Sequence, residues 1–304
     1  MDLTAALLES TVRAATPLAL AALGEVLIER SGVINIGLEG SVLAGAFGAA
    51  LVAQTLGADA GLLGGAFAGS LIGAFFALFA VSLRINQVIA GTAITLLALG
   101  LTGTLARTLF GEQGIALTLP TLSQTEIPGL RSLPIIGSAI FAQPYVVYLA
   151  LAGTILMQWW LSRTHAGLAL RAVGESPFAA IAAGIHPIRI RWVAILVGCA
   201  LAGLSGAVLV LAQAGTFVEG MSAGRGYIAI AIVALGRWQP LRVLTGSCLF
   251  GASMALQFTA QALNWRVPYQ LLLATPYLVT MVVLVLSARG SVPPAALGSS
   301  RDDT

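Results

Sequence analysis

The sequence predicts an all-α fold, a polytopic transmembrane helical bundle of about nine membrane helices, with eight to ten as the range. Two observations support this prediction. The 304-residue chain is 58% hydrophobic and only 9% charged, whereas about 25% of the residues in soluble domains are charged. Apolar runs of about 20 residues, the length that crosses a bilayer, also recur along the chain. They cover residues 12–28, 36–55, 61–82, 87–106, 144–162, 192–212, 218–236, 241–262 and 268–287.

The run at 218–236 is the weakest of these segments. Glu219 and Arg225 leave only GYIAIAIVALG as uninterrupted apolar sequence. Membranes tolerate non-helical backbone where protein encloses it. We therefore expect a broken or re-entrant helix here.

Arginine placement predicts the orientation, because inner loops carry an excess of basic residues. With nine crossings and an outer N-terminus, ten arginines fall inside and five outside. If 218–236 does not cross, everything after it changes side, and seven arginines fall inside and eight outside. The inner arginines are Arg30, Arg84, Arg163, Arg171, Arg189, Arg191, Arg237, Arg242, Arg289 and Arg301.

Residues 1–290 are expected to form a single transmembrane domain, followed by a disordered tail at 291–304. Two long connections interrupt the apolar runs, at 107–143 outside and 163–191 inside. The sequence contains no lysine, which excludes the P-loop that binds nucleotide phosphates through a lysine. The arginines and aromatic residues form no stripe that would bind nucleic acid.

Small residues are spaced for close helix packing in lipid. Gly65, Gly69 and Gly73 fall four apart, as do Gly198 and Gly206 with Ala202 between them. The strings AGAFGA at 44–49 and AGLSGA at 202–207 hint at related halves of the chain.

Few ionisable groups lie within the apolar runs, where they are expensive and tend to be functional. Glu25 and Glu29 are expected at the inner end of the first helix, where an interfacial position costs little. Glu39 lies deeper. It is either a proton-coupling carboxylate or a hydrogen-bonded structural residue at the positive end of a helix.

A second polar set consists of Asn35, Asn86, Gln87, Thr92 and Thr95. Gln87 and Thr95 share one helical face with Gly91, because they are spaced by four residues. That face either lines a polar path or forms a packed interface. The chain has no HExxH and no paired catalytic carboxylates, so we expect neither an enzyme nor a metal site.

The inner connection predicts a short helix. Ser176 suits the N-cap and Pro177 the first helical position, and Gly184 fits just past the helix end near Ala183. Phe178, Ile181, Ala182 and Ile185 then share one side. Such a helix either docks on a partner or lies against its own membrane domain or the lipid interface.

Five stretches, in order along nearly the whole chain, resemble the permease subunits of bacterial ABC importers for branched-chain amino acids, ribose-type sugars and nucleosides. The similarity is greatest to the shorter permease of the nucleoside and simple-sugar branch. The stretches are GEVLIERSGVINIGLEGSVLAGA (24–46), LRINQVIAGTAITLLALGLT (83–102), GLALRAVGESPFAAIAAGIHPIRIRWVAILVGCALAGLSGA (167–207), GTFVEGMSAGRGYIAIAIVALGRWQPLR (215–242) and VPYQLLLATPYL (267–278).

The resemblance implies that the 163–191 segment couples the permease to a cytoplasmic ATPase. The coupling residues would be Gly174, Glu175, Pro177, Phe178, Ala180, Ala183 and Gly184. Glu219, Arg225 and Tyr227 would border the translocation path, together with the polar set and Glu39. Relatives often carry asparagine where this chain has Thr95, which bears on specificity.

The resemblance also implies a multi-pass protein of the bacterial cytoplasmic membrane that moves nucleosides inward. Its partners would be a homologous second permease, a double-cassette ATPase, an extracytoplasmic substrate-binding lipoprotein and the lipid bilayer. ATP and magnesium would belong to the ATPase, with no cofactor bound by this chain. The alternatives are a simple sugar as solute, or an ion-coupled transporter that uses Glu39.

Overall fold

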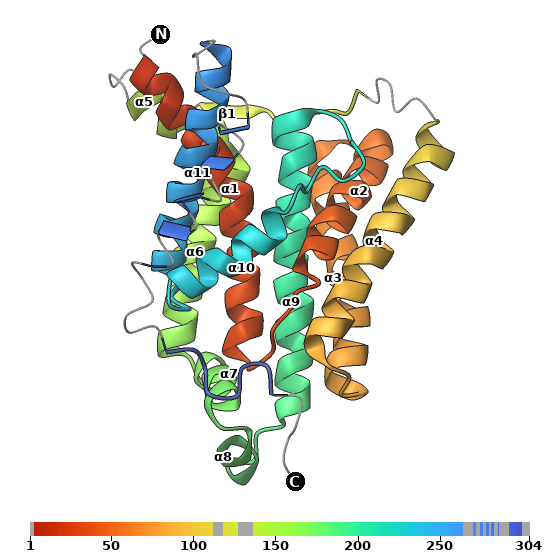
Figure 1. Ribbon diagram of the computed structural model, residues 1–304, viewed down its shortest axis with the longest axis vertical. Coiled ribbons are helices and arrows are strands. Elements are labelled where there is room, and N and C mark those ends of the chain that lie inside the picture. The colour runs from red at the N-terminus through yellow and green to blue at the C-terminus, as the bar shows by residue number, and fades with distance from the viewer. Residues whose placement is uncertain are drawn as a thin grey trace.

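The computed structural model describes residues 3–111, 118–126, 136–263 and 292–299, with scattered helical positions between 270 and 285. The all-α bundle is confirmed (Figure 1). In the described part of the chain, seven helices are long and apolar enough to cross a membrane. They are α1 (Leu3–Arg30), α2 (Leu38–Leu56), α3 (Ala58–Ala77) with its π-helical end η1 (Leu78–Ser82), α4 (Gln87–Phe110), α6 (Tyr145–Arg163), α9 (Pro187–Val208) with its π-helical end η2 (Leu209–Ala214), and α11 (Pro240–Ala262).

The weak segment at 218–236 contains a short helix, α10 (Arg225–Leu235). Its 11 residues extend only about 16 Å, roughly half the thickness of a bilayer core. Turns and non-helical backbone at 215–224 precede it. Figure 1 shows α10 crossing α1 and α9 near the middle of their length. This agrees with the broken helix that the sequence predicts. The segment at 268–287 lies outside the described residues apart from scattered positions, so the total of nine is not established.

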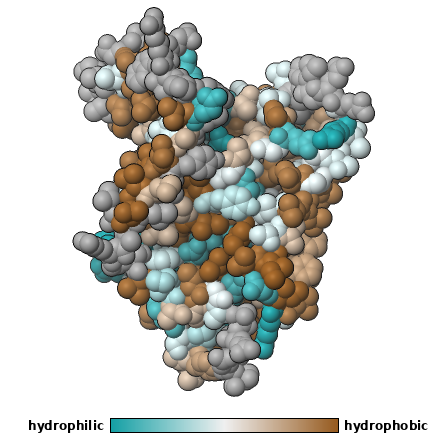
Figure 2. Space-filling view, viewed as in Figure 1, coloured by the Kyte–Doolittle hydropathy of each residue, from teal (hydrophilic) through white to brown (hydrophobic). Residues whose placement is uncertain are grey.

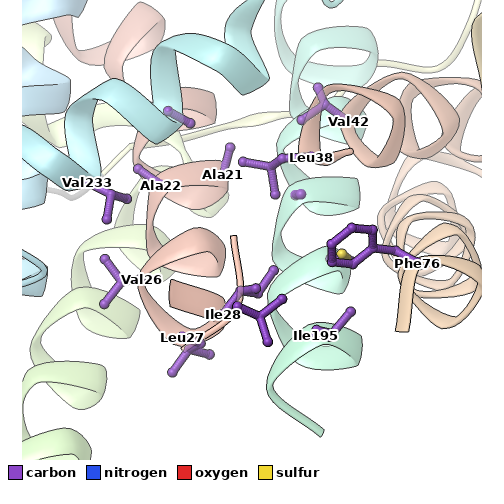
Figure 3. Packing of buried hydrophobic residues seen from close by; sticks show 14 of the residues in the cluster. Ala21, Ala22, Val26, Leu27, Ile28, Leu38, Val42, Phe76, Ile195 and Val233 are labelled. Atoms are coloured by element: carbon purple, nitrogen blue, oxygen red, sulfur yellow. The ribbon is translucent and has the colours of Figure 1, made fainter. Parts of the chain in front are cut away.

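A second helix also begins inside the bundle. After α1 ends at Arg30, residues 31–37 run without helix before α2 starts at Leu38. Figure 3 shows Leu38 beside Ala21, well before the end of α1. The chain therefore turns back from the end of α1 and enters the bundle again before α2 forms.

One end of the molecule carries the short helices α7 (His165–Glu175) and α8 (Pro177–Ala182) (Figure 1); we call it the α8 end. The predicted start of α8 is confirmed, because the Ser176 hydroxyl accepts a hydrogen bond from the Ala179 N–H at 3.3 Å and Pro177 occupies the first turn.

The last described segment, 292–299, lies on the same α8 end. The Ala296 N–H donates to the Gly174 carbonyl at 2.9 Å, and the Gly298 N–H donates to the Gly32 carbonyl at 3.2 Å. Ala296 is buried. Backbone hydrogen bonds thus hold residues 292–299, part of the tail that the sequence predicts to be disordered, against the α8 end.

The opposite end carries an element that the sequence did not predict. Strand β1 (Gln124–Glu126) pairs antiparallel with β2 (Ala142–Pro144), and helix α5 (Ile136–Phe141) leads into β2. Leu119 and Leu122 donate backbone hydrogen bonds to Gly215 and Leu211, both at 2.9 Å. The long outer connection is thus tied to the end of η2.

Backbone contacts between small residues join α2, α3 and α9. A Cβ on Gly73 would lie 2.6 Å from Cβ of Cys199, and one on Gly65 would lie 2.7 Å from Cβ of Ala207. Gly69, between them, lies against the backbone of Cys199 and Gly203. The predicted small-residue packing is confirmed. The strings AGAFGA and AGLSGA also meet in space, since Gly45 lies against Gly203 and Gly206 lies against the backbone of Ala46.

Candidate functional site

Glu39 joins the first turns of the two helices that begin inside the bundle. Its Oε1 accepts the Gly224 N–H at 2.8 Å and its Oε2 accepts the Gly226 N–H at 2.6 Å. These amides are among the unpaired donors at the start of α10, where a carboxylate is favoured by the helix dipole. Glu39 is 7% exposed. We call this contact of Glu39 with Gly224 and Gly226 the half-helix junction.

The structural role expected for Glu39 is thus present, but on a different helix. The sequence suggested that Glu39 would benefit from the positive end of its own helix, α2. In the structure its carboxylate caps α10 instead. No local pattern in the sequence connects positions 39 and 224, which is why the partner was not foreseen.

Side chains from two helices satisfy the backbone of the non-helical segment 31–37. The Ile34 N–H donates to Gln87 Oε1 at 2.8 Å, and the Asn35 N–H donates to Glu25 Oε1 at 3.1 Å. The Thr95 hydroxyl donates to the Ile36 carbonyl at 3.4 Å. Buried backbone groups without partners are costly. These hydrogen bonds offset that cost, so the non-helical segment can re-enter the bundle.

The shared face of Gln87, Gly91 and Thr95 faces this segment. A Cβ on Gly91 would lie 2.7 Å from the Gly37 nitrogen, and the two polar residues bond to the segment as described above. Of the two alternatives for this face, a polar path or a packed interface, these contacts favour the packed interface. Asn35 itself is fully buried and donates through Nδ2 to Cys199 Sγ at 3.3 Å.

Asn86 and Thr92 lie away from that interface. Asn86 caps α4, accepting from the Val88 and Ile89 N–H groups at 3.0 and 3.3 Å. Thr92 is exposed, and its hydroxyl donates to carbonyls of its own helix. These two residues do not contact the half-helix junction.

Glu25 and Glu29 lie toward the end of α1, as the sequence predicts, but they are buried among protein groups. Glu25 is fully buried, Glu29 is 4% exposed, and Glu29 Oε2 accepts a hydrogen bond from Trp238 Nε1. Arg237 and Trp238 both have left-handed backbones, with φ of 52° and 55°, a conformation that is uncommon outside glycine. The Glu29–Trp238 bond therefore anchors a strained turn after α10.

Trp238 was not among the predicted site residues. A signal was nevertheless present in the sequence: two glutamates four residues apart share one face of an apolar helix. Such a pair in a membrane helix requires buried partners. The structure supplies Asn35 to one carboxylate and Trp238 to the other.

The remaining predicted path residues lie on the α10 side of the bundle. Glu219 forms an exposed ion pair with Arg107 at 2.7 Å, and Arg225 donates to the Met221 and Ser222 carbonyls at 2.9 and 3.1 Å. Tyr227 is 45% exposed. Figure 2 shows hydrophilic and intermediate side chains among the hydrophobic ones on this side of the molecule.

The predicted coupling segment has a buried part and an exposed part. Gly174 lies against the Arg30 carbonyl, where a side chain would collide. Ala180 is 1% exposed, so it supports α8 from within. Phe178 and Ile181 are 54% and 53% exposed. The other coupling residues are half-buried Pro177 and exposed Glu175, Ala183 and Gly184.

A bundle of membrane-length helices with two helices that begin at its interior, joined by a buried carboxylate, is typical of membrane transport proteins. Among the described residues no cluster of His, Cys, Asp and Glu could hold a metal ion.

Residues 7–288 match the family described as branched-chain amino acid transport system / permease component. The chain belongs to this family, as the resemblance implied, and is a transport subunit of the ABC permease type rather than an enzyme.

Curated relatives cover almost the whole chain. A Haloferax volcanii protein, provisionally named as a glucose ABC transporter permease, is 37% identical over 98% of both chains. The guanosine ABC transporter permease NupQ of Bacillus subtilis is 33% identical, covering 94% of this chain and 93% of that one. The nucleoside ABC transporter permease NupC of Lactococcus lactis is 32% identical, covering 93% and 92%. Both H. volcanii and B. subtilis also have a second matching permease named for the same solute.

Proposed function

We propose that this chain is one of two permease subunits of an ABC importer that moves nucleosides inward across a bacterial cytoplasmic membrane. A cytoplasmic double-cassette ATPase would supply the energy, with ATP and magnesium bound there. An extracytoplasmic lipoprotein would deliver the solute. The nucleoside assignment rests on the guanosine and nucleoside permeases among the relatives. The second permease rests on the two organisms whose relatives occur as pairs.

The half-helix junction is the observation that carries the transport role. Broken helices in transporters place backbone groups and helix ends within the membrane, where a solute passes. Here the residues next to the junction, Arg225 and Tyr227, are partly exposed, while Glu39 holds the start of α10 in place. We assign Arg225, Tyr227 and Glu219 to the path. Asn35, Gln87 and Thr95 do not line the path in this proposal; they hold segment 31–37 in place.

A continuous series of contacts connects α8 to this junction. Gly174, three residues before the start of α8, lies against the Arg30 carbonyl. Arg191 donates to the Ser31 carbonyl at 3.3 Å, and residues 31–37 then lead directly to Glu39. Movement of α8 by the ATPase would shift the start of α2 and, through Glu39, the start of α10. ATP would bias the two states by its differential affinity for the closed ATPase dimer.

The exposed apolar side of α8 favours contact with a partner or with lipid over packing against its own membrane domain, and we propose the partner. Phe178 and Ile181 each expose more than half of their surface, at the end of the molecule farthest from the start of α1 (Figure 1). A helix that rested on its own membrane domain would bury these side chains.

Two alternatives have specific support or a specific test. A simple sugar is the second candidate solute, because the H. volcanii relative is named for glucose. An ion-coupled transporter would need a titrating Glu39. Both oxygens of that carboxylate already accept backbone amides, which favours the structural role.

Uptake of labelled guanosine, uridine, ribose and glucose, in cells with and without this gene, tests the proposal. Loss of guanosine and uridine uptake alone is the expected result. Loss of sugar uptake alone would retain the importer and replace the nucleoside with a sugar. Unchanged uptake of all four would refute the proposed solutes. Transport by the chain in the absence of an ATPase would refute the ABC mechanism.

A further inference from the structure

A polar pocket opens at the α8 end of the molecule, away from the half-helix junction. Its volume is about 180 Å³, and its walls come from α6, α7, the end of α1 and the turn between α10 and α11. The polar lining residues are Arg30, Gln158, Ser162, Arg171 and Gln239. We call it the Arg30–Arg171 pocket.

Two like charges face this pocket. Arg30 and Arg171 lie close enough to repel each other, and Glu175 is the acidic group near Arg30. One oxygen of Glu175 already accepts the Ala295 N–H at 3.4 Å. The residues that line the pocket thus include two arginines and no carboxylate. Two arginines directed into one pocket are a stable arrangement when an anion lies between them.

The two guanidinium groups are held differently. The Nε–H of Arg171 is buried and has no hydrogen-bond partner among the described residues, so a ligand in the pocket would meet its terminal NH₂ groups. Arg30 differs, because its Nε donates to the Trp238 carbonyl at 3.1 Å, which orients the guanidinium. Pro240, also in the lining, begins α11, whose N-terminus has no side-chain cap. The first helical hydrogen bond of α11 is donated by Val243, so the N–H groups of Leu241 and Arg242 precede it and add to the positive potential.

The surroundings place the pocket at a membrane boundary. Trp159, next to Gln158 on α6, is 56% exposed, and Leu241, next to Pro240, is 49% exposed. Tryptophan is enriched where apolar surface meets the headgroup region. Basic pockets between membrane helices on the cytoplasmic side bind anionic lipid headgroups.

We propose that the Arg30–Arg171 pocket binds a phosphate group, supplied by the headgroup of an anionic phospholipid of the inner leaflet. Two guanidinium groups match phosphate oxygens, and the Ser162 hydroxyl and the side-chain amides add neutral donors. The site lies outside the transport path, and no solute or ATP is needed to observe binding. Its failure can therefore be distinguished from failure of the proposed function.

The bound phosphate would also have a mechanical effect. It would bridge Arg171 on α7, which leads into α8, to Arg30 at the end of α1. In the proposed function, movement of α8 by the ATPase passes through these same elements to the half-helix junction. An empty pocket leaves two arginines that repel each other at the same place.

The test uses the full-length chain purified with its partner subunits. Native mass spectrometry and thermal melting are compared in phosphatidylglycerol and phosphatidylcholine, with inorganic phosphate as a separate soluble probe. Phosphatidylglycerol is expected to bind preferentially and to raise the melting temperature. Arg171→Gln should weaken its binding about tenfold, the size of the loss of one hydrogen bond between charged groups. Arg189→Gln, an exposed arginine outside the pocket, should leave binding unchanged.

Each outcome decides the proposal. Arg171 is the decisive position because it is half-buried on a surface helix, whereas Arg30→Gln also removes the bond to Trp238. A preference for phosphatidylglycerol that inorganic phosphate does not displace supports the lipid headgroup. Displacement by millimolar phosphate keeps the phosphate site but overturns the lipid as its source. Equal binding of the two lipids with no phosphate effect, or equal losses in Arg171→Gln and Arg189→Gln, overturns the site.

Discussion

Replacing Glu39 tests whether the half-helix junction depends on a charged cap. Glu39→Gln keeps the size of the side chain but removes the charge and one acceptor, because one oxygen becomes an amide NH₂. That group would face a backbone N–H of Gly224 or Gly226, both of which donate to the carboxylate in the native protein. One buried amide would lose its partner. The first turn of α10 should then open more readily.

The expected size follows from the two contacts. Hydrogen bonds to a charged group contribute about 1.5–3 kcal/mol each. Loss of one bond and weakening of the other predicts a local cost of about 2–3 kcal/mol for Glu39→Gln. Every 1.4 kcal/mol is tenfold, so amide exchange at 224–226 should become roughly one hundredfold faster. Hydrogen–deuterium exchange of the purified protein measures this directly. Glu39→Ala, which removes both acceptors, should have a larger effect.

Glu9→Gln is the matched control. Glu9 pairs with Arg13 at 2.8 Å on a partly exposed turn of α1, where an ion pair contributes less than about 1 kcal/mol. Exchange at 224–226 should not change in this variant. If Glu39→Gln keeps native protection at these amides, the capping role assigned here is wrong. If transport is also lost while protection is native, Glu39 acts as a titrating group instead.

Three further predictions concern packing, docking and the tail. Gly69→Leu should lower the melting temperature strongly, because the new side chain would collide with the backbone of α9. Gly100→Leu is the control, since Gly100 has open space around it, and it should melt like the native protein. Equal melting temperatures of the two variants would refute the close contact at Gly69. Phe178→Asp should abolish stimulation of the partner ATPase in a permease that melts normally, since it charges the exposed side of α8; native stimulation would contradict docking there. Truncation after residue 291 should speed tryptic cleavage near α7, because the backbone bonds of 292–299 to Gly174 are lost; unchanged cleavage would show that the seated segment does not stabilise α7.

Much of the architecture could be predicted because it follows from local sequence. Apolar run length defined the helices, and the four-residue spacing of Gly65, Gly69 and Gly73 identified a packed face. The Ser176–Pro177 pair marked the start of α8 correctly. Glu219 and Arg225 also indicated the break before α10. Each of these signals lies within a few residues of the structure that it specifies.

The rest depends on contacts between distant segments. Glu39 meets Gly224, Glu29 meets Trp238, and the tail meets Gly174, and no local pattern encodes these pairs. Burial of Ala180 was missed for a related reason: a six-residue helix shows too little periodicity to tell its inner side from its outer side. The sequence therefore predicted the position of α8, but not which of its side chains are buried, such as Ala180, and which are exposed, such as Phe178.

The seating of residues 292–299 links two parts of the molecule that are far apart in the sequence. Gly32 follows the end of α1, and Gly174 lies near the end of α7. Both accept backbone hydrogen bonds from the same short segment, through Gly298 and Ala296. A substitution that prevents this seating would therefore loosen the ends of α1 and α7 together, because neither contact can be lost without displacing the segment that makes the other.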